Sequence, residues 1–432
     1  MEVVPDSRSS RLCGTSPAAE HSASMRSVAG VTAALALVAV GLGVGPGAYR
    51  ASAASADSTV VREPVAQGVD YQAFTVPTSQ GSARVHVVTV DLDRPGVAAD
   101  LLHPGTVAAR ETVSRMGEDA GAVAAINGDF FNITEEQHPG VQATGAPCGP
   151  AVLDGLPLKG AVPDGQRFGG PMPVGDTDED VFGVDADGTA RMGRQVLHGH
   201  IRTLRGTLAL GGLNQYALPV DSVGAFTSQW GAVSRARAAC GTDDHRGAPC
   251  TSETYEVTVR HGHVETLSDT PGTGPIDPDT TVLLGREAGA RALRELAPGT
   301  PVEVDYHLST TNPVPYTFAL GAYPLLRDHQ PLAGLDNVTA EPRSAIGIAD
   351  GGHTLRLLST DGREGTSSGL TLSELAGVLQ SLDCAQASYL DGGGSATLAT
   401  RDPGTGRVTV RNSLAHQQER PVPNGIAIFS SR

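Results

Sequence analysis

The chain has 432 residues, a length that allows one large domain or two of average size. Its formal net charge of −16 argues against general nucleic-acid binding, because a surface that follows a phosphate backbone needs clustered Lys and Arg. Aromatic residues make up only 4% of the chain and Ala, Gly and Pro are abundant, a composition typical of GC-rich bacterial genomes. We therefore expect no nucleic-acid partner, although a small local anion site is compatible with this charge.

The N-terminal segment has the pattern of an export signal. Met25 opens a short basic region, an apolar stretch follows over 28–44, and two small-x-small cleavage sites lie within 51–56. We predict a signal peptide over 25–56, with residues 1–24 as a disordered extension or the result of a misassigned start. The protein is then expected to be secreted or associated with the cell envelope. An uncleaved membrane anchor is the alternative, because the apolar stretch is near the lower length limit for a span.

The cysteines agree with export. Cys13 would leave with the signal, and an even number remains, a count typical of exported proteins with disulfides. We predict a Cys240–Cys250 disulfide that closes a short loop, and a Cys148–Cys384 disulfide by subtraction. A metal site is the alternative, but the chain has no Cys-x-x-Cys pair, so zinc binding by cysteine is not favoured.

A polar lead-in is predicted over 57–69, and a single domain follows over 70–432. Alternating and continuous apolar runs predict strands, and apolar residues at helical spacing predict helices. The segment 140–180 is rich in Gly, Pro and Asp, so its strands must be short and its loops many. The elements predicted before residue 310 are strands over 85–92, 122–126 and 302–308, helices over 112–120 and 288–296, and a hairpin of 255–259 with 264–267.

The clearest helix starts at Thr371 and carries one apolar stripe at helical spacing. Thr371 and Glu374 form a capping box, in which the hydroxyl and the carboxylate each accept a hydrogen bond from a backbone amide of the first turn. Strands are predicted on either side of this helix, over 354–359 and 385–390. If these strands run parallel, Asp361 and Asp391 lie at the same sheet edge, where ligand sites gather.

The most informative motif runs from Tyr389 to Ser395, where an apolar strand ends in an acid, three glycines and a serine. Consecutive glycines cost backbone entropy, so they indicate a sharp turn or a close approach of another group to the backbone. Taken alone, the motif is equally compatible with a simple tight turn. Further fragments accompany it in a fixed order along the chain: 124–131, 341–349, 359–363, 369–376, 411–413 and 419–429.

This ordered series resembles the phosphodiester glycosidase family, which includes the uncovering enzyme that removes N-acetylglucosamine from mannose 6-phosphate diesters. The match is dense over 341–429, clear at 121–132 and weak between them. We expect an exported α+β protein with β-rich mixed sheets, a few helices and a single catalytic domain over 70–432. The resemblance implies hydrolysis of a glycosyl-1-phosphodiester at the anomeric carbon, to free sugar and a phosphomonoester, on a cell-wall or exopolysaccharide type of glycan.

Such chemistry needs a carboxylate near the anomeric carbon or its attacking water, and cationic or amide donors for the phosphate. Strong general-acid assistance is less necessary, because the leaving phosphomonoester is already a stable anion. The predicted catalytic acids are Asp361, Glu374 and Asp391. Guanidinium groups bind oxyanions and consecutive glycine amides can form an anion nest. The predicted substrate-binding residues are Asn127, Asp129, Arg343, Gly392, Gly393, Gly394, Ser395 and Arg420.

Several of these residues also have purely structural explanations. Glu374 is explained as a capping residue, Asp361 precedes a glycine and can belong to a turn, and Arg343 can pair with a structural carboxylate. Ser395 lacks the Gly-x-Ser-x-Gly surroundings of a serine nucleophile, so we assign it to hydrogen bonding. Asp129 and Tyr389 stand where the family more usually has Gly and Asn, so the preferred sugar can differ here.

No metal and no cofactor are predicted. His198 and His200 share a strand spacing that can bind a metal, but no third ligand is evident from the sequence. His261 and His263 are expected to be exposed residues of the predicted hairpin. The expected partner is a sugar phosphodiester or another anionic glycan, with membrane contact only through an uncleaved signal. Two other functions are left open: a non-catalytic envelope module that binds anionic glycans, and a phosphodiesterase that cuts the P–O bond.

Overall fold

The computed structural model describes residues 60–362 and 367–431, and strands dominate this part of the chain. The predicted extension over 1–24 and the predicted signal over 25–56 lie outside the described residues. Within the described part, four sheets and three α-helices form one domain of the α+β class, so the predicted fold class is confirmed. No described helix has both the length and the apolar character needed to cross a membrane.

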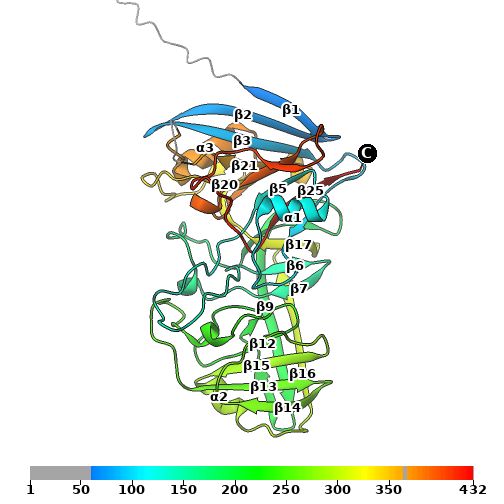
Figure 1. Cartoon of the computed structure of the whole chain (residues 1–432), viewed down its shortest axis with the longest axis vertical. Coiled ribbons are helices and arrows are strands. Elements are labelled where there is room, and N and C mark those ends of the chain that lie inside the picture. The colour runs from blue at the N-terminus through cyan, green and yellow to red at the C-terminus, as the bar shows by residue number, and fades with distance from the viewer. Residues whose placement is uncertain (1–59, 363–366, 432) are drawn as a thin grey trace, which may run out of the picture. The chain divides into compact units, whose positions relative to one another are not determined.

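The largest sheet has eight strands in the order β1-β2-β3-β21-β20-β22-β18-β19 (Figure 1). Val85, Val87, Val88 and Val90 of β3 are fully buried, so both faces of this strand are covered. The predicted lead-in supplies the edge strand β1. The strands are β1 (Val61–Ala66), β2 (Val69–Thr78), β3 (Gly81–Asp91), β18 (Tyr323–Arg327), β19 (Gln330–Pro331), β20 (Ser344–Ala349), β21 (Thr354–Thr360) and β22 (Gln386–Tyr389).

A five-stranded sheet, β24-β23-β5-β25-β4, carries the start of the fragment 124–131 singled out in the sequence. Its central strand β5 is buried throughout and ends at Asn127, as the short apolar run predicted. Helix α1 (Val113–Ala120) lies near β5 and β24 and ends at Gly121, whose positive φ of 74° favours glycine. The strands are β4 (Val97–Leu102), β5 (Ala124–Asn127), β23 (Leu398–Arg401), β24 (Val408–Val410) and β25 (Gly425–Ser430).

A third sheet has the order β10-β9-β8-β17-β6-β7, and β16 pairs with β9 outside this path. The antiparallel pair of β9 and β16 is long and runs side by side in Figure 1. The short strands β6 and β7 lie in the segment predicted to be rich in loops. The strands are β6 (Ala151–Leu153), β7 (Leu156–Lys159), β8 (Asp180–Asp185), β9 (Ala190–Thr203), β10 (Gly206–Ala209), β16 (Val302–Thr310) and β17 (Tyr316–Gly321).

The fourth sheet, β11-β12-β15-β13-β14, contains the predicted hairpin. Strands β13 and β14 pair in antiparallel register around His261 and Gly262, so the hairpin is confirmed. Helix α2 (Ala288–Leu293) follows β15 and is shorter than predicted. The strands are β11 (Gly212–Leu213), β12 (Val223–Phe226), β13 (Thr254–Arg260), β14 (His263–Ser268) and β15 (Thr280–Arg286). Short 3₁₀ turns occur at Asp164–Gln166, Ala236–Ala239, Asp350–Gly352 and Gly393–Ser395.

The predicted strand–helix–strand unit is present, with one extra strand between its two strands. Strands β21 and β22 are each antiparallel to β20, so they run in the same direction but are not neighbours. Helix α3 (Leu372–Ser381) connects them and has the predicted capping box: Glu374 N donates to Thr371 Oγ1 at 3.2 Å, and Thr371 N donates to Glu374 Oε2 at 2.9 Å. Asp361 and Asp391 therefore leave the sheet at the same edge.

One of the two predicted disulfides is present. Cys240 and Cys250 are joined, which confirms the short-loop pairing. The Cys148–Cys384 pairing is wrong, because both thiols are free and buried in different surroundings. Cys148 lies 3.2 Å from the hydroxyl of Tyr216, whereas Cys384 packs closely over Gly347 of β20.

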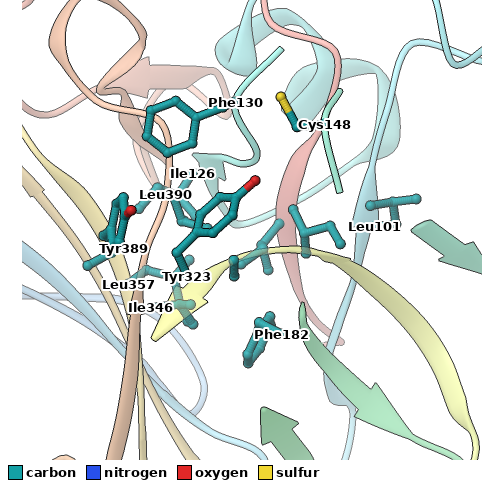
Figure 2. Packing of buried hydrophobic residues seen from close by; sticks show 14 of the residues in the cluster. Leu101, Ile126, Phe130, Cys148, Phe182, Tyr323, Ile346, Leu357, Tyr389 and Leu390 are labelled. Atoms are coloured by element: carbon teal, nitrogen blue, oxygen red, sulfur yellow. The ribbon is translucent and has the colours of Figure 1, made fainter. Parts of the chain in front are cut away.

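The main hydrophobic core joins side chains from the eight-stranded sheet, α3 and neighbouring loops. Figure 2 shows Phe130, Tyr323 and Tyr389 gathered around the end of β22, close to Leu390. Their ring centroids are 5.4 to 5.9 Å apart, mostly in edge-to-face geometry. Leu390, the residue directly before Asp391, thus belongs to the hydrophobic core, and its packing fixes the position of the Asp391 backbone.

Candidate active site

A pocket of about 600 Å³ opens where β22 ends, and residues 391–394 of the predicted motif line it. Of the residues predicted from the sequence, Arg343, Asp391, Gly392, Gly393, Gly394 and Arg420 line it. The opposite lining comes from the loop 169–173, together with Phe130 and Tyr389. The structure therefore brings together two guanidinium groups, two aromatic rings and three acids, because Asp336 and Glu341 line the pocket besides Asp391.

Asp391 is the only one of the three predicted catalytic acids that lines this pocket. Its backbone is held on both sides: its N–H donates to Gly128 O at 2.8 Å, and its carbonyl accepts from Asn127 Nδ2 at 2.7 Å. Burial raises the pKa of its carboxyl to about 6, although Ser395, Arg420 and the Gly392 amide stabilise the ionised form. A carboxyl with such a pKa can accept or donate a proton near neutral pH.

Ser395 and Arg420 form a hydrogen-bonded chain beside the Asp391 carboxyl. Ser395 is fully buried and bonds to Asp391, and its Oγ also accepts from Arg420 Nη1 at 3.2 Å. A side chain at Gly394 would collide with the Arg420 guanidinium, because its Cβ would lie 2.4 Å from Nη2. Glycine at this position therefore allows the guanidinium to lie against the backbone beside Asp391.

The glycine amides form only part of the predicted anion nest. Gly392 N donates to Asp391 Oδ1 at 2.9 Å, and Gly393 N donates to Pro342 O at 2.8 Å. Gly393 has a φ of 56°, in the left-handed region that favours glycine. Two of the three amides are thus occupied within the protein, and the glycines act mainly to shape the turn that presents Asp391.

Arg343 lines the pocket through a guanidinium that is anchored to backbone. Its Nε donates to Leu370 O at 3.0 Å and its Nη2 donates to Thr339 O at 2.8 Å. Its Nη1 lies 3.6 Å from the carboxylate of Glu341, so the structural pairing considered from the sequence is also present. The side chain is only 10% exposed and lines the pocket with its guanidinium held in place by these partners.

Asn127 and Asp129 lie behind the pocket and do not line it. The Asn127 side-chain oxygen accepts from Ser344 Oγ at 2.7 Å and from Thr397 N at 3.0 Å, while its nitrogen holds Asp391. Asp129 accepts from Gly149 N at 2.6 Å and from the Tyr323 hydroxyl at 3.0 Å, and both residues are fully buried. In the described structure they position their neighbours instead of facing a ligand, so the prediction that they bind substrate directly is not supported by this geometry.

Asp361 and Glu374 are also outside the pocket. Asp361 Oδ1 accepts from Ser413 N at 2.7 Å and lies 2.8 Å from His86 Nε2, and these hydrogen bonds lower the pKa of its carboxyl despite partial burial. Glu374 completes the capping box and also accepts from Ser79 N at 2.6 Å. Hydrogen bonds lower its pKa as well. Glu374 therefore has the capping role given above as its structural explanation. Asp361 is held by groups remote in the sequence, Ser413 and His86, and not by the local turn considered above.

Sequence reasoning missed Arg167, a buried guanidinium directly behind the aromatic lining. Its Cζ lies 4.2 Å from the ring centroid of Phe130 and 4.1 Å from that of Tyr323. Its Nη1 donates to Gly170 O at 2.6 Å, which ties it to the loop 169–173 that lines the pocket. Its Nη2 lies 3.4 Å from the Tyr389 hydroxyl. No local signal marks this arginine, since Phe130, Tyr323 and Tyr389 all come from distant segments.

A buried network continues from Arg167. Arg167 Nε lies 3.4 Å from Asp178 Oδ1, and the Tyr323 hydroxyl oxygen lies 2.9 Å from Asp178 Oδ1 and 3.0 Å from Asp129 Oδ1. Since the hydroxyl has a single proton, it donates to one carboxyl and accepts from the other when that carboxyl is protonated. Burial raises the pKa values of both carboxyls. Burial also lowers the pKa of Lys159, on the far side of Asp129, to about 8. The unusual Asp129 and Tyr389 are thereby connected through Tyr323, so the two departures from the family pattern belong to one structural unit.

Comparisons with known proteins agree with the motif. Residues 253–429 match the family model described as phosphodiester glycosidase, a segment that includes Arg343, Asp391 and Arg420. No curated protein matches the chain. A hypothetical protein from Synechocystis has a similar structure, with a TM-score of 0.65 and 22% identity over 86% of this chain, which spans 64% of that protein.

Two further solved structures are similar. A Burkholderia pseudomallei K96243 protein described as exported has a TM-score of 0.60 and 24% identity, with 81% of this chain and 74% of that one covered. The catalytic domain of zebrafish N-acetylglucosamine-1-phosphodiester alpha-N-acetylglucosaminidase, auto-inhibited by its pro-peptide, is a distant match, with a TM-score of 0.41, 14% identity, and 86% and 85% of the two chains covered. The predicted resemblance is confirmed for residues 253–429, which match the phosphodiester glycosidase family.

Proposed function

We propose that this protein hydrolyses a glycosyl-1-phosphodiester at the anomeric carbon and releases free sugar and a phosphomonoester. The observation that carries this proposal is the position of Asp391, whose carboxyl has a pKa of about 6, in one pocket with Arg343 and Arg420. The family match over 253–429 supports a hydrolase acting on phosphodiester glycans. We also propose that residues 70–432 form the catalytic domain, with β1 as its additional edge strand.

Each group has a role that its surroundings support. Asp391 in its ionised form accepts a proton from the attacking water or stabilises positive charge at the anomeric carbon. Arg420 binds the phosphate oxygens, because guanidinium groups pair with oxyanions through charge-assisted hydrogen bonds. Arg343, whose Nε and Nη2 donate to backbone carbonyls, adds positive charge at the same wall of the pocket. A second carboxylate is less necessary than in ordinary glycosidases, since the departing phosphomonoester is a stable anion. Of the three predicted acids only Asp391 lines the pocket, although Asp336 and Glu341 also line it.

The aromatic side of the pocket is suited to a sugar ring. Phe130 and Tyr389 line the pocket although both are largely buried, and Arg167 contacts both. We propose that the glycosyl group lies on this side and the phosphate on the arginine side. The substrate would be a cell-wall or exopolysaccharide type of glycan, encountered after export through the segment 25–56. Intact mass of the exported protein should place its N-terminus between Ala54 and Asp57, and a mature form that retains 28–44 would argue for an anchor.

Isotope-labelled water tests the reaction. The enzyme is incubated with a panel of glycosyl-1-phosphodiesters of both anomeric configurations, and the products are analysed by mass spectrometry. Cleavage at the anomeric carbon places the label on the sugar, whereas cleavage of the P–O bond places it on the phosphate and would make the protein a phosphodiesterase. Binding of these compounds without turnover would instead support a non-catalytic glycan-binding module.

A further inference from the structure

The paired strands β9 and β16 bring histidines from distant parts of the sequence onto one face. In their antiparallel register His198 lies opposite His307, and His200 lies opposite Asp305. Side chains two residues apart on a strand share a face, so these four form a square across the two strands. Residues on the other face, including Ile201 and Val304, pack into a hydrophobic cluster, so the square faces outward.

We propose that this square binds a divalent transition metal ion such as zinc, with His200, Asp305 and His307 as ligands. His200 Nε2 lies 3.3 Å from Asp305 Oδ2, yet it makes no hydrogen bond within the described residues. Two ligand atoms at about 2.0–2.1 Å from a tetrahedral zinc are roughly 3.3 Å apart. The spacing of this pair therefore already equals one edge of a zinc coordination sphere.

His307 supplies the third ligand. It is exposed and its side chain makes no hydrogen bond within the described residues, so its ring is free to turn. Its ring now stacks on that of His198, with centroids 5.3 Å apart. A diagonal neighbour on the paired strand is within reach of a long side chain, so turning this ring brings its nitrogen toward His200 and Asp305. His198 Nε2 instead lies 2.9 Å from Ser309 Oγ, and water or a turned His198 would complete the tetrahedron.

The neighbouring groups are consistent with a metal ligand role for Asp305. Arg202 Nη1 donates to Asp305 Oδ2 at 3.0 Å and to Glu303 at 2.9 Å, which orients the carboxylate from outside. Outer hydrogen bonds of this kind commonly hold ligating carboxylates. In the described part the ligand atoms of His138, Cys240 and Cys250 already converge, but the two sulfurs are joined in the disulfide and supply no thiolate. At the square, by contrast, the third ligand is brought to the other two only when the His307 ring turns.

Zinc titration of the full exported chain without a histidine tag tests the proposal, by isothermal calorimetry near neutral pH. We expect one ion per chain, and His200→Ala and His307→Ala should each weaken binding by about tenfold or more. His353→Ala is the matched control, because His353 also pairs with one carboxylate, Asp93, at 2.8 Å. It should leave binding unchanged, and circular dichroism should show that every variant is folded.

Zinc should also raise the melting temperature of the wild type, because a ligand that binds only the folded state stabilises it. This increase should disappear in His307→Ala and persist in His353→Ala. No binding at submillimolar zinc, or equal affinity in wild type, His200→Ala and His307→Ala, would overturn the proposal. The experiment needs no glycan substrate, so its result is independent of the proposed hydrolysis.

Discussion

Replacing Asp391 with Asn keeps the size of the side chain and removes its charge. If Asp391 is the acid–base group, turnover should fall by about 10²–10⁴-fold, the usual cost of losing a positioned proton acceptor. In the wild type, kcat/KM should rise with pH through an apparent pKa near 6 as the carboxyl ionises, and this step should be absent in the variant. The measurement is a pH–rate profile for wild type and Asp391→Asn on the same glycosyl phosphodiester.

Asp391→Asn should lower turnover but raise the stability of the folded protein at pH 8. The pKa of Asp391 is raised from 3.8 to about 6, which corresponds to about 3 kcal/mol against the ionised form in the folded state. The wild type therefore loses stability as pH rises from about 4 through 6, whereas the Asn variant does not. With an unfolding entropy of about 0.8 kcal/mol per kelvin for a domain of this size, Asp391→Asn should melt about 4 °C higher at pH 8. The difference should vanish below about pH 3, where Asp391 is protonated in both folded and unfolded chains.

Melting curves and turnover should be measured on one preparation of each protein. A catalytic Asp391 predicts lost turnover with an equal or higher melting temperature at pH 8. Turnover above about a tenth of the wild-type value would refute the catalytic assignment, since it is far above the range expected for an acid–base group. A lower melting temperature at every pH would show that the carboxylate stabilises the turn, and would refute the reasoning from burial.

Three further outcomes test the pocket and the fold. Arg420→Lys keeps the charge but loses the planar fork, so KM should rise by roughly tenfold for each lost charge-assisted bond. Arg343→Lys should lower the melting temperature more than Arg420→Lys, because the Arg343 guanidinium donates to two backbone carbonyls whereas Arg420 donates to the Ser395 hydroxyl alone among the described residues. Unchanged kinetics in both would place the phosphate elsewhere. Arg167→Met should cost about 3–5 kcal/mol, because Asp178 loses its buried partner, and denaturant unfolding that matches wild type would contradict this role. Non-reducing peptide mapping should find Cys240 and Cys250 joined, and Cys250→Ser should cost about 3 kcal/mol for a loop of this length; free thiols at both positions would contradict the pairing.

The sequence by itself predicted the features that depend on contacts between residues close together in the chain. The capping box at Thr371 and Glu374 satisfies amides within one helical turn, so its residues alone specify where α3 begins. The Cys240–Cys250 pair closes a short loop, and the turn after Asp391 needs glycine to position Arg420 and to adopt a positive φ at Gly393. The family resemblance rested on the same kind of contiguous fragment, and it was confirmed over 253–429.

Tertiary structure decided which of these residues meet. Asp361 and Asp391 leave the same sheet edge, but β20 lies between their strands, so only Asp391 reaches the pocket. Counting cysteines predicts a Cys148–Cys384 disulfide, yet the two thiols are buried among different neighbours and stay free. Arg167 approaches Tyr389 from 222 positions away, and His307 approaches His198 through strand register. Such contacts depend on how sheets and loops pack, because the free energy of burying a side chain comes from neighbours that are remote in the sequence.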